Sequence, residues 1–256
     1  MTGVLICGIC GRMGRQLVES AAETDVRVVC GVDVQAGEVS GIPVYDSFDA
    51  VRERADCIID FSNHALLPKI LAYALDKRLP TVIATTGHTE AERAQMREAA
   101  AHIPVFSSGN MSLGINVLIS LAKSAAAALG SDFDIEIVEM HHNRKLDAPS
   151  GTALMIADGI REALPYEPEY IYDRTQRREP RDRSEIGIHS IRGGTIVGEH
   201  EVIFSGRGEV IRISHSAQGR ELFAQGALAA AEYIKNKQNG LYSMKELLTD
   251  SAVGMK

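Results

Sequence analysis

Residues 3–14 read GVLICGICGRMG, and this stretch decides the fold of the first part of the chain. The apolar run GVLIC is typical of a buried strand, and a helical pattern begins among the glycines that follow it. Gly8, Gly11 and Gly14 allow a pyrophosphate to approach the backbone closely, and the helix start offers free N–H groups. The stretch therefore predicts a dinucleotide-binding turn. Its spacing departs from G-x-G-x-x-G, so a tight turn without a ligand is the alternative.

An acidic residue at the end of the next apolar run supports this interpretation. Asp33 follows the glycine turn by about 20 residues, the offset at which an acid binds the ribose of a dinucleotide. Its carboxylate can bond a 2′-hydroxyl but repels a 2′-phosphate, and Val34 and Gln35 follow it in place of an arginine. The sequence therefore predicts that NADH is preferred, with NADPH still accepted because Arg12 can meet a phosphate.

The first hundred or so residues alternate short β-branched runs with amphipathic stretches, as parallel strands joined by crossover helices do. The expected strands are 3–7, 26–33, 56–61, 80–86 and 103–108, and the expected helices lie near 12–23, 63–77 and 89–101. A three-layer α/β domain follows from this order.

The pattern changes after about residue 112. A long Ala-rich helix leads to DFDIEIVEMHH (132–142), whose period of two predicts a half-exposed strand. Three further strand-like runs are EIGIHSIRGG, TIVGEHEVIFSG and EVIRISHSA, and their short glycine-containing connections favour antiparallel pairing. We expect a mixed or open sheet covered on one face, then a final helix and a short helical tail.

Composition limits the class of protein. The chain has 256 residues, 45% of them hydrophobic, and a formal net charge of -7. We find neither a signal-peptide pattern nor an apolar run long enough to cross a bilayer, and no basic stripe for phosphates. We therefore expect a cytoplasmic protein with no nucleic-acid or membrane partner. The segment Arg174–Arg183, with five arginines, is expected to be a long exposed loop.

The cysteines do not indicate a metal site. Cys7, Cys30 and Cys57 lie in apolar runs, where cysteine behaves as a small hydrophobe, and Cys10 completes a single C-x-x-C. No histidine pair near them completes a zinc ligand set, so we expect no bound metal.

Small polar residues follow two of the expected strands. TTG (85–87) and SSGNMS (107–112) stand at the carboxyl ends of the fourth and fifth strands, where open α/β sheets bind ligands. Thr85, Thr86, Gly109 and Asn110 are candidates for lining a nicotinamide pocket, with ordinary loop chemistry as the alternative.

The richest stretch is HHNRKLDAPSGTA (141–153). Ser150 is a suitable N-cap for the helix that follows Pro149. Free N–H groups at that helix start, together with Lys145 and one histidine, make a receptor for a carboxylate, and the other histidine can act as a general acid. The alternative, exposed polar residues beside an ordinary cap, does not explain why they cluster.

EMHHNRKLDAPSGTA (139–153) resembles the signature of the dihydrodipicolinate reductases, also called 4-hydroxy-tetrahydrodipicolinate reductases, of the diaminopimelate and lysine pathway. The resemblance extends to GRMG, TTG, SGNMSLGIN and SHSAQGRELFAQGAL, and so covers nearly the whole chain in order. It implies a Rossmann-type doubly wound parallel sheet formed by residues 1–112 and 221–256. It also implies an α+β domain of residues 113–220 that binds substrate and packs in a homotetramer.

The resemblance also implies roles for individual residues. His141 would be the catalytic acid and Lys145 a second proton donor, for a reaction that adds hydride to C4 of a cyclic dicarboxylate imine. Substrate contacts would come from His142, Ser150, Gly151, Thr152 and Arg220. Cofactor contacts would come from Gly8, Gly11, Arg12, Met13, Asp33, Ala84, Thr85, Thr86, Ser108, Gly109, Asn110 and Met111. Ala84 stands where the family commonly has glycine.

Two other functions remain open at this point. A semialdehyde dehydrogenase needs a nucleophilic cysteine in its substrate domain, and the chain has none after Cys57. An amino-acid dehydrogenase with the same two-domain plan is not excluded in this way. A non-catalytic NAD(H) sensor would not need the residues of HHNRK, so replacing His141 and Lys145 would leave a sensor intact and disable an enzyme.

Overall fold

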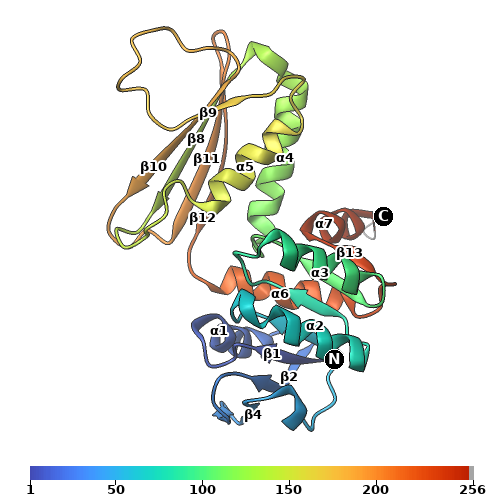
Figure 1. The fold of residues 1–256 in the computed structure, drawn as a ribbon. Coiled ribbons are helices and arrows are strands. Elements are labelled where there is room, and N and C mark those ends of the chain that lie inside the picture. The colour runs from blue at the N-terminus through green and yellow to red at the C-terminus, as the bar shows by residue number, and fades with distance from the viewer. Residues whose placement is uncertain (254–256) are drawn as a thin grey trace. The chain divides into compact units, whose positions relative to one another are not determined.

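The computed structural model describes residues 1–253 and divides the chain into two compact units (Figure 1). The first unit comprises Met1–Leu113 and Arg220–Lys256, and the second comprises Gly114–Gly219. Each unit has its own sheet and its own helices, and the α/β class predicted from the sequence is confirmed.

The sheet of the first unit has eight strands in the order β13-β7-β6-β5-β1-β2-β4-β3, all parallel to their neighbours except β3. The strands are β1 (Thr2–Cys7), β2 (Val26–Val32), β3 (Gly37–Val39), β4 (Ile42–Tyr45), β5 (Cys57–Asp60), β6 (Thr81–Ile83), β7 (Pro104–Ser107) and β13 (Gly240–Tyr242). The five predicted strands are confirmed. The other three, β3, β4 and β13, lie at the two ends of the strand order and were missed.

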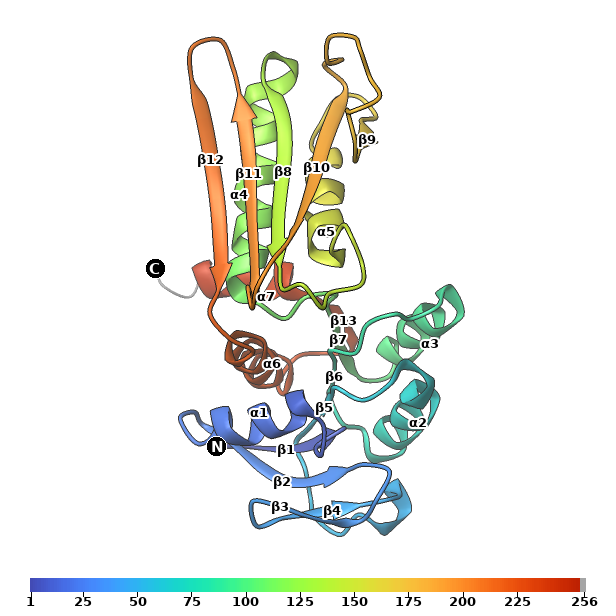
Figure 2. The same ribbon diagram turned by 90° about the vertical axis from the view of Figure 1, so that its left-hand side faces the viewer.

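Helices cover both faces of this sheet, as Figure 2 shows. They are α1 (Arg12–Ala21), α2 (Leu67–Lys77), α3 (Glu90–Ala100), α6 (Glu221–Ile234) and α7 (Met244–Val253). One core contains side chains of α1, α6 and α7, and the other contains side chains of α2 and α3. Because both faces are covered, every residue of β1 and β5 is buried, including Cys7 and Cys57.

The second unit is a five-stranded mixed sheet in the order β12-β11-β8-β10-β9. Its strands are β8 (Asp134–His141), β9 (Glu169–Ile171), β10 (Glu185–Arg192), β11 (Gly198–Ser205) and β12 (Val210–Ala217). Figure 2 shows α4 (Leu113–Leu129) and α5 (Gly151–Arg161) on one face of this sheet. The core between them contains Leu118, Ala122 and Ile156 together with inward residues of the strands.

The expected pairing of the later strands is only partly right. β11 and β12 form the antiparallel pair that was predicted. β10, however, does not pair with β11, because β8 lies between them and β10 runs parallel to β8. The glycines at 193 and 194 therefore belong to a connection that passes over the end of β8, with the Gly193 N–H bonded to the carbonyl of His141.

The expectation that no apolar segment is long enough to span a bilayer is wrong by length and composition. The helical stretch Leu113–Asp132 passes that test among the described residues. Leu118, Ala122 and Ala126 of this stretch are buried in the core of the second unit, so the fold uses it as a packing helix. Only 22% of its apolar window is buried, and one such helix is weak evidence for a membrane.

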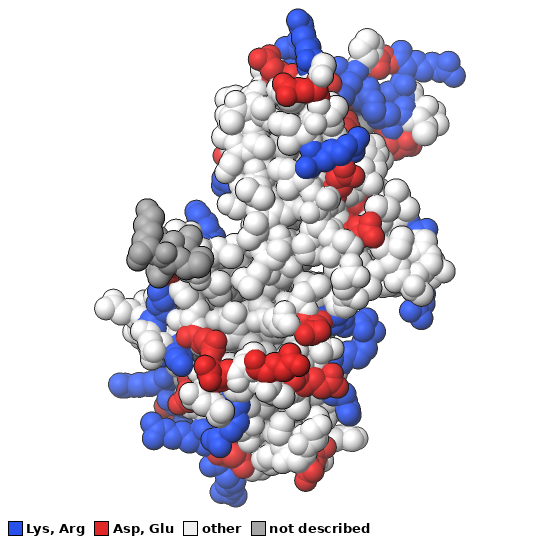
Figure 3. All heavy atoms as spheres, turned by 180° about the vertical axis from the view of Figure 1, so that it is seen from behind, with Lys and Arg blue, Asp and Glu red and all other residues white. Residues whose placement is uncertain are grey.

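Several arginines of the Arg174–Arg183 loop form ion pairs with carboxylates, which an exposed loop does not need. Arg181 donates to the carboxylates of Asp134 and Glu136, each at 2.9 Å, and its side chain is only 15% exposed. Arg174 and Arg177 both pair with Glu185. Figure 3 shows Lys and Arg interspersed with Asp and Glu over the described residues of one face.

Candidate active site

The glycine turn after β1 is shaped by close backbone contacts. A Cβ on Gly14 would lie 2.3 Å from the carbonyl oxygen of Gly8, and one on Gly8 would lie 2.8 Å from the carbonyl oxygen of Phe61. Gly8 also has a φ of +81°, which L side chains rarely adopt. Glycine is therefore required at position 8 because the turns after β1 and β5 meet, and at position 14 because α1 packs against the turn after β1. These strands are neighbours at the point where the strand order reverses, which is where such sheets bind ligands.

The start of α1 is open to an anion. Gly11 is the N-cap and offers no side-chain hydrogen bond, and no acidic residue lies in the first turn. Arg12 is exposed and Met13 is half-buried against the core. Uncapped N–H groups with the positive end of the helix dipole suit a phosphate.

Asp33 connects the glycine turn to the end of β2. Its carboxylate accepts hydrogen bonds from the N–H of Cys10 at 2.8 Å and of Val34 at 2.7 Å, one on each oxygen. Each carboxylate oxygen can accept a second hydrogen bond, so a ribose hydroxyl can still bind there. Val34 is 90% exposed beside it.

A hollow of about 230 Å³ opens at the carboxyl ends of β5 and β6. Its lining includes the predicted residues Ala84, Thr85 and Thr86, and also four residues that the sequence analysis missed, Phe61 to His64. Asp60 is fully buried beneath them and accepts hydrogen bonds from the N–H and hydroxyl of Ser62 at 2.9 and 2.5 Å. Burial raises the pKa of Asp60, which these hydrogen bonds oppose.

The turn after β7 contains the remaining predicted cofactor residues. The hydroxyl of Ser108 donates to the carbonyl of Asn110 at 2.8 Å and accepts from its N–H at 3.3 Å. Gly109 is exposed, whereas Met111 is buried in the core, so only its backbone is suited to a ligand. A Cβ on Gly226 of α6 would collide with the carbonyl of Met111, which explains the glycine in that helix.

In the second unit, His141 ends β8 and is held by a buried carboxylate. Its Nδ1 lies 2.6 Å from Oε2 of Glu139, a residue with no exposed surface. Arg192 of β10 donates to both oxygens of Glu139, at 2.8 and 2.6 Å, in a bidentate pair. Burial raises the pKa of Glu139, but hydrogen bonds from Arg192, Ser190 and His141 outweigh it and hold the pKa at about 2. Burial lowers the pKa of His141, and Glu139 opposes that shift.

The start of α5 lies against the same cluster. Ser150 is the N-cap, as predicted, and its hydroxyl accepts from the N–H of Ala153 at 3.1 Å. The same hydroxyl lies 3.0 Å from Nε2 of His200, and the Ser150 N–H donates to Glu139 at 3.1 Å. Burial lowers the pKa of His200 to about 4, so this histidine is neutral. Gly151 is exposed, and a Cβ there would meet open space.

The loop between β8 and α5 contains two further predicted residues. Lys145 Nζ pairs with Asp147 at 2.9 Å, and its side chain is 21% exposed. This hydrogen bond lowers the pKa of Asp147. Nδ1 of His142 is buried with no hydrogen-bond partner in residues 1–253. Arg220 belongs to the first unit, where it is the N-cap of α6.

Sequence reasoning missed Glu139, Arg192 and His200. A signal existed for Glu139, because it continues the buried phase of Ile135 and Ile137 on β8. Arg192 and His200 gave no such signal, because their partners are remote in sequence.

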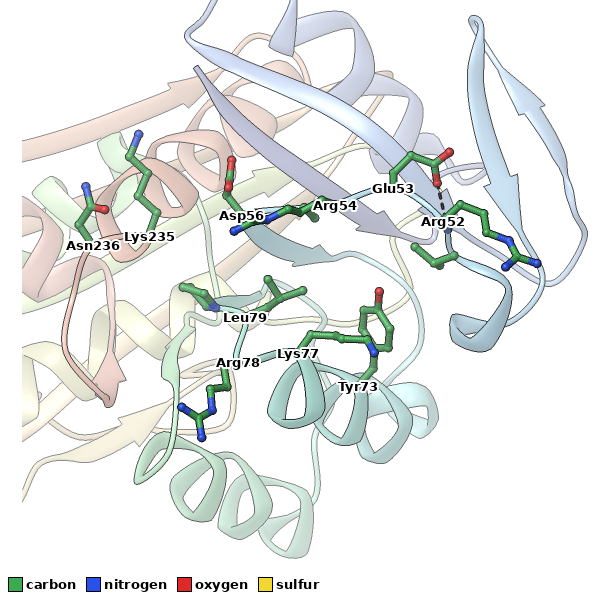
Figure 4. Close-up of a pocket in the computed structure, with 13 residues that line it drawn as sticks. Arg52, Glu53, Arg54, Asp56, Tyr73, Lys77, Arg78, Leu79, Lys235 and Asn236 are labelled. Atoms are coloured by element: carbon green, nitrogen blue, oxygen red, sulfur yellow. Dashed lines mark hydrogen bonds between the residues drawn. The ribbon is translucent and has the colours of Figure 1, made fainter.

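A larger hollow, of about 650 Å³, opens in the first unit at the amino ends of β5 and β6 (Figure 4). Its polar groups do not converge. Lys235 donates to the hydroxyl of Thr2 at 2.7 Å, and the guanidinium groups of Arg52 and Arg78 point in different directions. We assign no ligand to this hollow, since binding sites need convergent polar groups.

A Rossmann-type unit joined to a second unit that holds a histidine, a lysine and a serine-capped helix start defines the class of this chain. It is a nicotinamide-dependent oxidoreductase. Family models named dihydrodipicolinate reductase match both units, the N-terminus over residues 2–111 and the C-terminus over residues 114–248. The chain belongs to the dihydrodipicolinate reductase family.

Relatives agree over almost the full length. A 4-hydroxy-tetrahydrodipicolinate reductase of Caldanaerobacter subterraneus subsp. tengcongensis is 52% identical over 249 residues, which cover 97% of this chain and 98% of the relative. One from Zymomonas mobilis is 42% identical over 95% of each chain. The family resemblance drawn from the sequence is thereby confirmed.

Solved structures agree on the fold. The dipicolinate-bound dihydrodipicolinate reductase from Paenisporosarcina sp. TG-14 matches with a TM-score of 0.80 at 24% identity, covering 95% of this chain and 97% of that one. DAP dehydrogenase of C. glutamicum in complex with DAP matches with a TM-score of 0.58 at 18% identity, covering 99% and 98%. At these identities the likeness concerns the fold.

Proposed function

We propose that this chain reduces 4-hydroxy-tetrahydrodipicolinate to tetrahydrodipicolinate with NADH or NADPH, a step of lysine and diaminopimelate biosynthesis. Water is lost from the substrate, hydride adds at C4 of the conjugated cyclic imine, and a proton from His141 adds at C3. The main observation that supports this mechanism is the hydrogen-bonded cluster of His141, Glu139 and Ser150 at the start of α5.

His141 is the proton donor in this proposal. Negative charge develops on the ring as hydride arrives, and an imidazolium beside it neutralises that charge. Nδ1 of His141 faces Glu139, so Nε2 is the atom that can deliver the proton. Lys145 and its positive charge assist as a second donor near the substrate.

The helix start and the cations bind the two substrate carboxylates. Ser150 uses its N–H for Glu139 and its hydroxyl for Ala153 and His200. We therefore assign most of the carboxylate contact to the backbone at Gly151 and Thr152, which continue from this fixed residue into α5. His142 and Lys145 complete the receptor, and Arg220 is assigned to the substrate on the family resemblance alone. The dipicolinate bound to the Paenisporosarcina reductase is a ligand of this chemical class.

The first unit binds the cofactor in this proposal, and the bound nicotinamide supplies the hydride. The glycine turn and the start of α1 take the pyrophosphate, and Asp33 takes the ribose hydroxyls, which favours NADH over NADPH. Backbone and small side chains at Ala84–Thr86 and Ser108–Met111 bind the nicotinamide end. We also propose, from the family resemblance, a cytoplasmic homotetramer.

The test follows the loss of reduced nicotinamide absorbance with substrate freshly generated from pyruvate and aspartate semialdehyde. His141→Gln and Lys145→Ala should each lose at least about a hundredfold in kcat, as removal of an acid–base group does, while NADH binding is retained. His189→Gln is the matched control, since His189 also pairs with a carboxylate of β8, at 2.7 Å. A wild type that binds NADH without oxidising it in the presence of this substrate would overturn the proposal.

A further inference from the structure

Glu139 is a buried carboxylate whose hydrogen-bond partners come from three separate elements. It has no exposed surface and accepts hydrogen bonds from His141, from the Ser150 N–H and from two nitrogens of Arg192. Those partners come from β8, from the start of α5 and from β10. One ionised group therefore joins the histidine assigned as acid to the helix start assigned to the substrate.

The hydrogen bonds fix the orientation of the His141 ring. A carboxylate only accepts hydrogen bonds, so the Nδ1 of His141 must carry the proton that it shares with Glu139. Nε2 points the other way, toward Gly198, where a Cβ would lie 3.1 Å from it. Nε2 is therefore the ring nitrogen that points away from Glu139, whether His141 is neutral or protonated.

Charged and titratable groups face His141 from every element packed against it. Glu139 lies on its own strand, Arg192 on β10, His200 on β11 with ring centroids 5.3 Å apart, and Lys145 on the following loop. Behind His200, its neighbour in the β11–β12 pair is His215. Glu139 is the negative group in this set that contacts the His141 ring, and Arg192 and Lys145 oppose it.

We propose that Glu139, clamped by Arg192, is the positioning residue for His141. It fixes the ring with Nε2 presented for proton delivery, and its charge keeps the ring able to hold a proton beside Lys145 and Arg192. The same carboxylate anchors the start of α5 through Ser150. This inference rests on the proposed function, in which His141 is the acid.

The test compares pH profiles of kcat. An acid catalyst works below its pKa, so activity falls as the pH rises through it. Glu139→Gln removes the negative charge, so the alkaline limb should move to lower pH by about one unit, a tenfold change in proton affinity. Arg192→Met removes an opposing positive charge, so the limb should move to higher pH. If the two substitutions only damaged the structure, activity would fall in both variants, but their alkaline limbs would not move in opposite directions.

Two more variants separate charge from geometry. Glu139→Asp keeps the charge but shortens the reach, so kcat should fall about tenfold while the limb stays near that of the wild type. It also keeps the test available if Glu139→Gln fails to fold. Glu136→Gln is the matched control, because Glu136 also lies on β8 and pairs with Arg181 and His189. Equal limb shifts in Glu136→Gln and Glu139→Gln would overturn the proposal.

A readout that does not depend on turnover distinguishes this inference from the proposed function. In nitrogen-15 spectra of labelled histidines, the signal absent from His141→Gln reports the tautomer and pKa of His141. The wild type should show the Nδ1–H form at alkaline pH, and Glu139→Gln should show a lower pKa. If the wild type is inactive yet these shifts occur, the proposed function fails and the positioning role stands. An unchanged pKa in Glu139→Gln overturns the positioning role even in an active enzyme.

Discussion

In the proposed function, Asp33 is the residue that governs the choice between the two cofactors. Its oxygens accept hydrogen bonds from the Cys10 and Val34 N–H groups, so the carboxylate is fixed beside the glycine turn. A fixed negative charge there disfavours a 2′-phosphate, and the described neighbours offer an exposed apolar side chain, Val34, where a cation would compensate. Because Val34 is exposed, a substitution at position 34 disturbs little packing.

Val34→Arg should therefore raise the preference for NADPH. An exposed guanidinium–phosphate pair contributes about 1 kcal/mol or less, so we expect the ratio of kcat/KM for NADPH to that for NADH to rise by up to about fivefold. The gain should shrink with added salt. Val34→Gln is the control of similar length without charge. If both variants change the ratio equally, charge at this position does not select the cofactor.

Individual residues show which parts of the site a sequence can predict. The glycine turn, Asp33 and Ser150 are local features, which form a turn, a strand end and a helix cap, respectively. Each can be predicted from its neighbours in the sequence. The partners of Glu139 are not local: Arg192 lies 53 positions away. Glu139 occupies the same face of β8 as Ile135 and Ile137. That position alone would have predicted a buried carboxylate that needs a cation as a partner.

At the scale of elements, the first sheet was easier to predict than the second. Parallel strands with crossover helices have a repeated pattern, and right-handed crossovers leave few alternative orders. In the second sheet, the position of β10 beside β8 depends on parallel backbone pairing between remote segments. The short glycine connection before β11 favoured a hairpin that the chain does not form.

Helix α3 begins with a capping box that its sequence already shows. The hydroxyl of Thr89 accepts from the Glu92 N–H at 3.2 Å, and the Glu92 carboxylate accepts from the Thr89 N–H at 2.7 Å. Thr89→Ala should lower the free energy of unfolding by about 1 kcal/mol, measured by urea denaturation. Thr249→Ala is the control, because the Thr249 hydroxyl only bonds a carbonyl one turn back within α7. Equal losses in both variants would contradict a specific role for the cap.

At the scale of the whole molecule, the proposed function draws most contacts of the two ligands from separate units, and Arg220 of the first unit is the exception among the substrate residues. The residues proposed for the cofactor lie in the unit built on the eight-stranded sheet, and the cluster around His141 lies in the unit built on the five-stranded sheet. A ligand that contacts only one unit should therefore order the backbone of that unit first, because stabilisation by binding acts on the segments that the ligand holds.

Amide hydrogen exchange on the full chain tests this division. NADH alone should slow exchange in the glycine turn and after β6, where small residues approach the dinucleotide. Pyridine-2,6-dicarboxylate alone should slow exchange at the start of α5 and in the loop after β8, because its carboxylates bond N–H groups there. Peptides of the Arg174–Arg183 loop, already tied to the sheet by Arg181, serve as the internal control and should not respond to either ligand. If the dicarboxylate protects only segments of the first unit, then His141 and Lys145 do not bind it, and the substrate site has to be sought on the eight-stranded sheet.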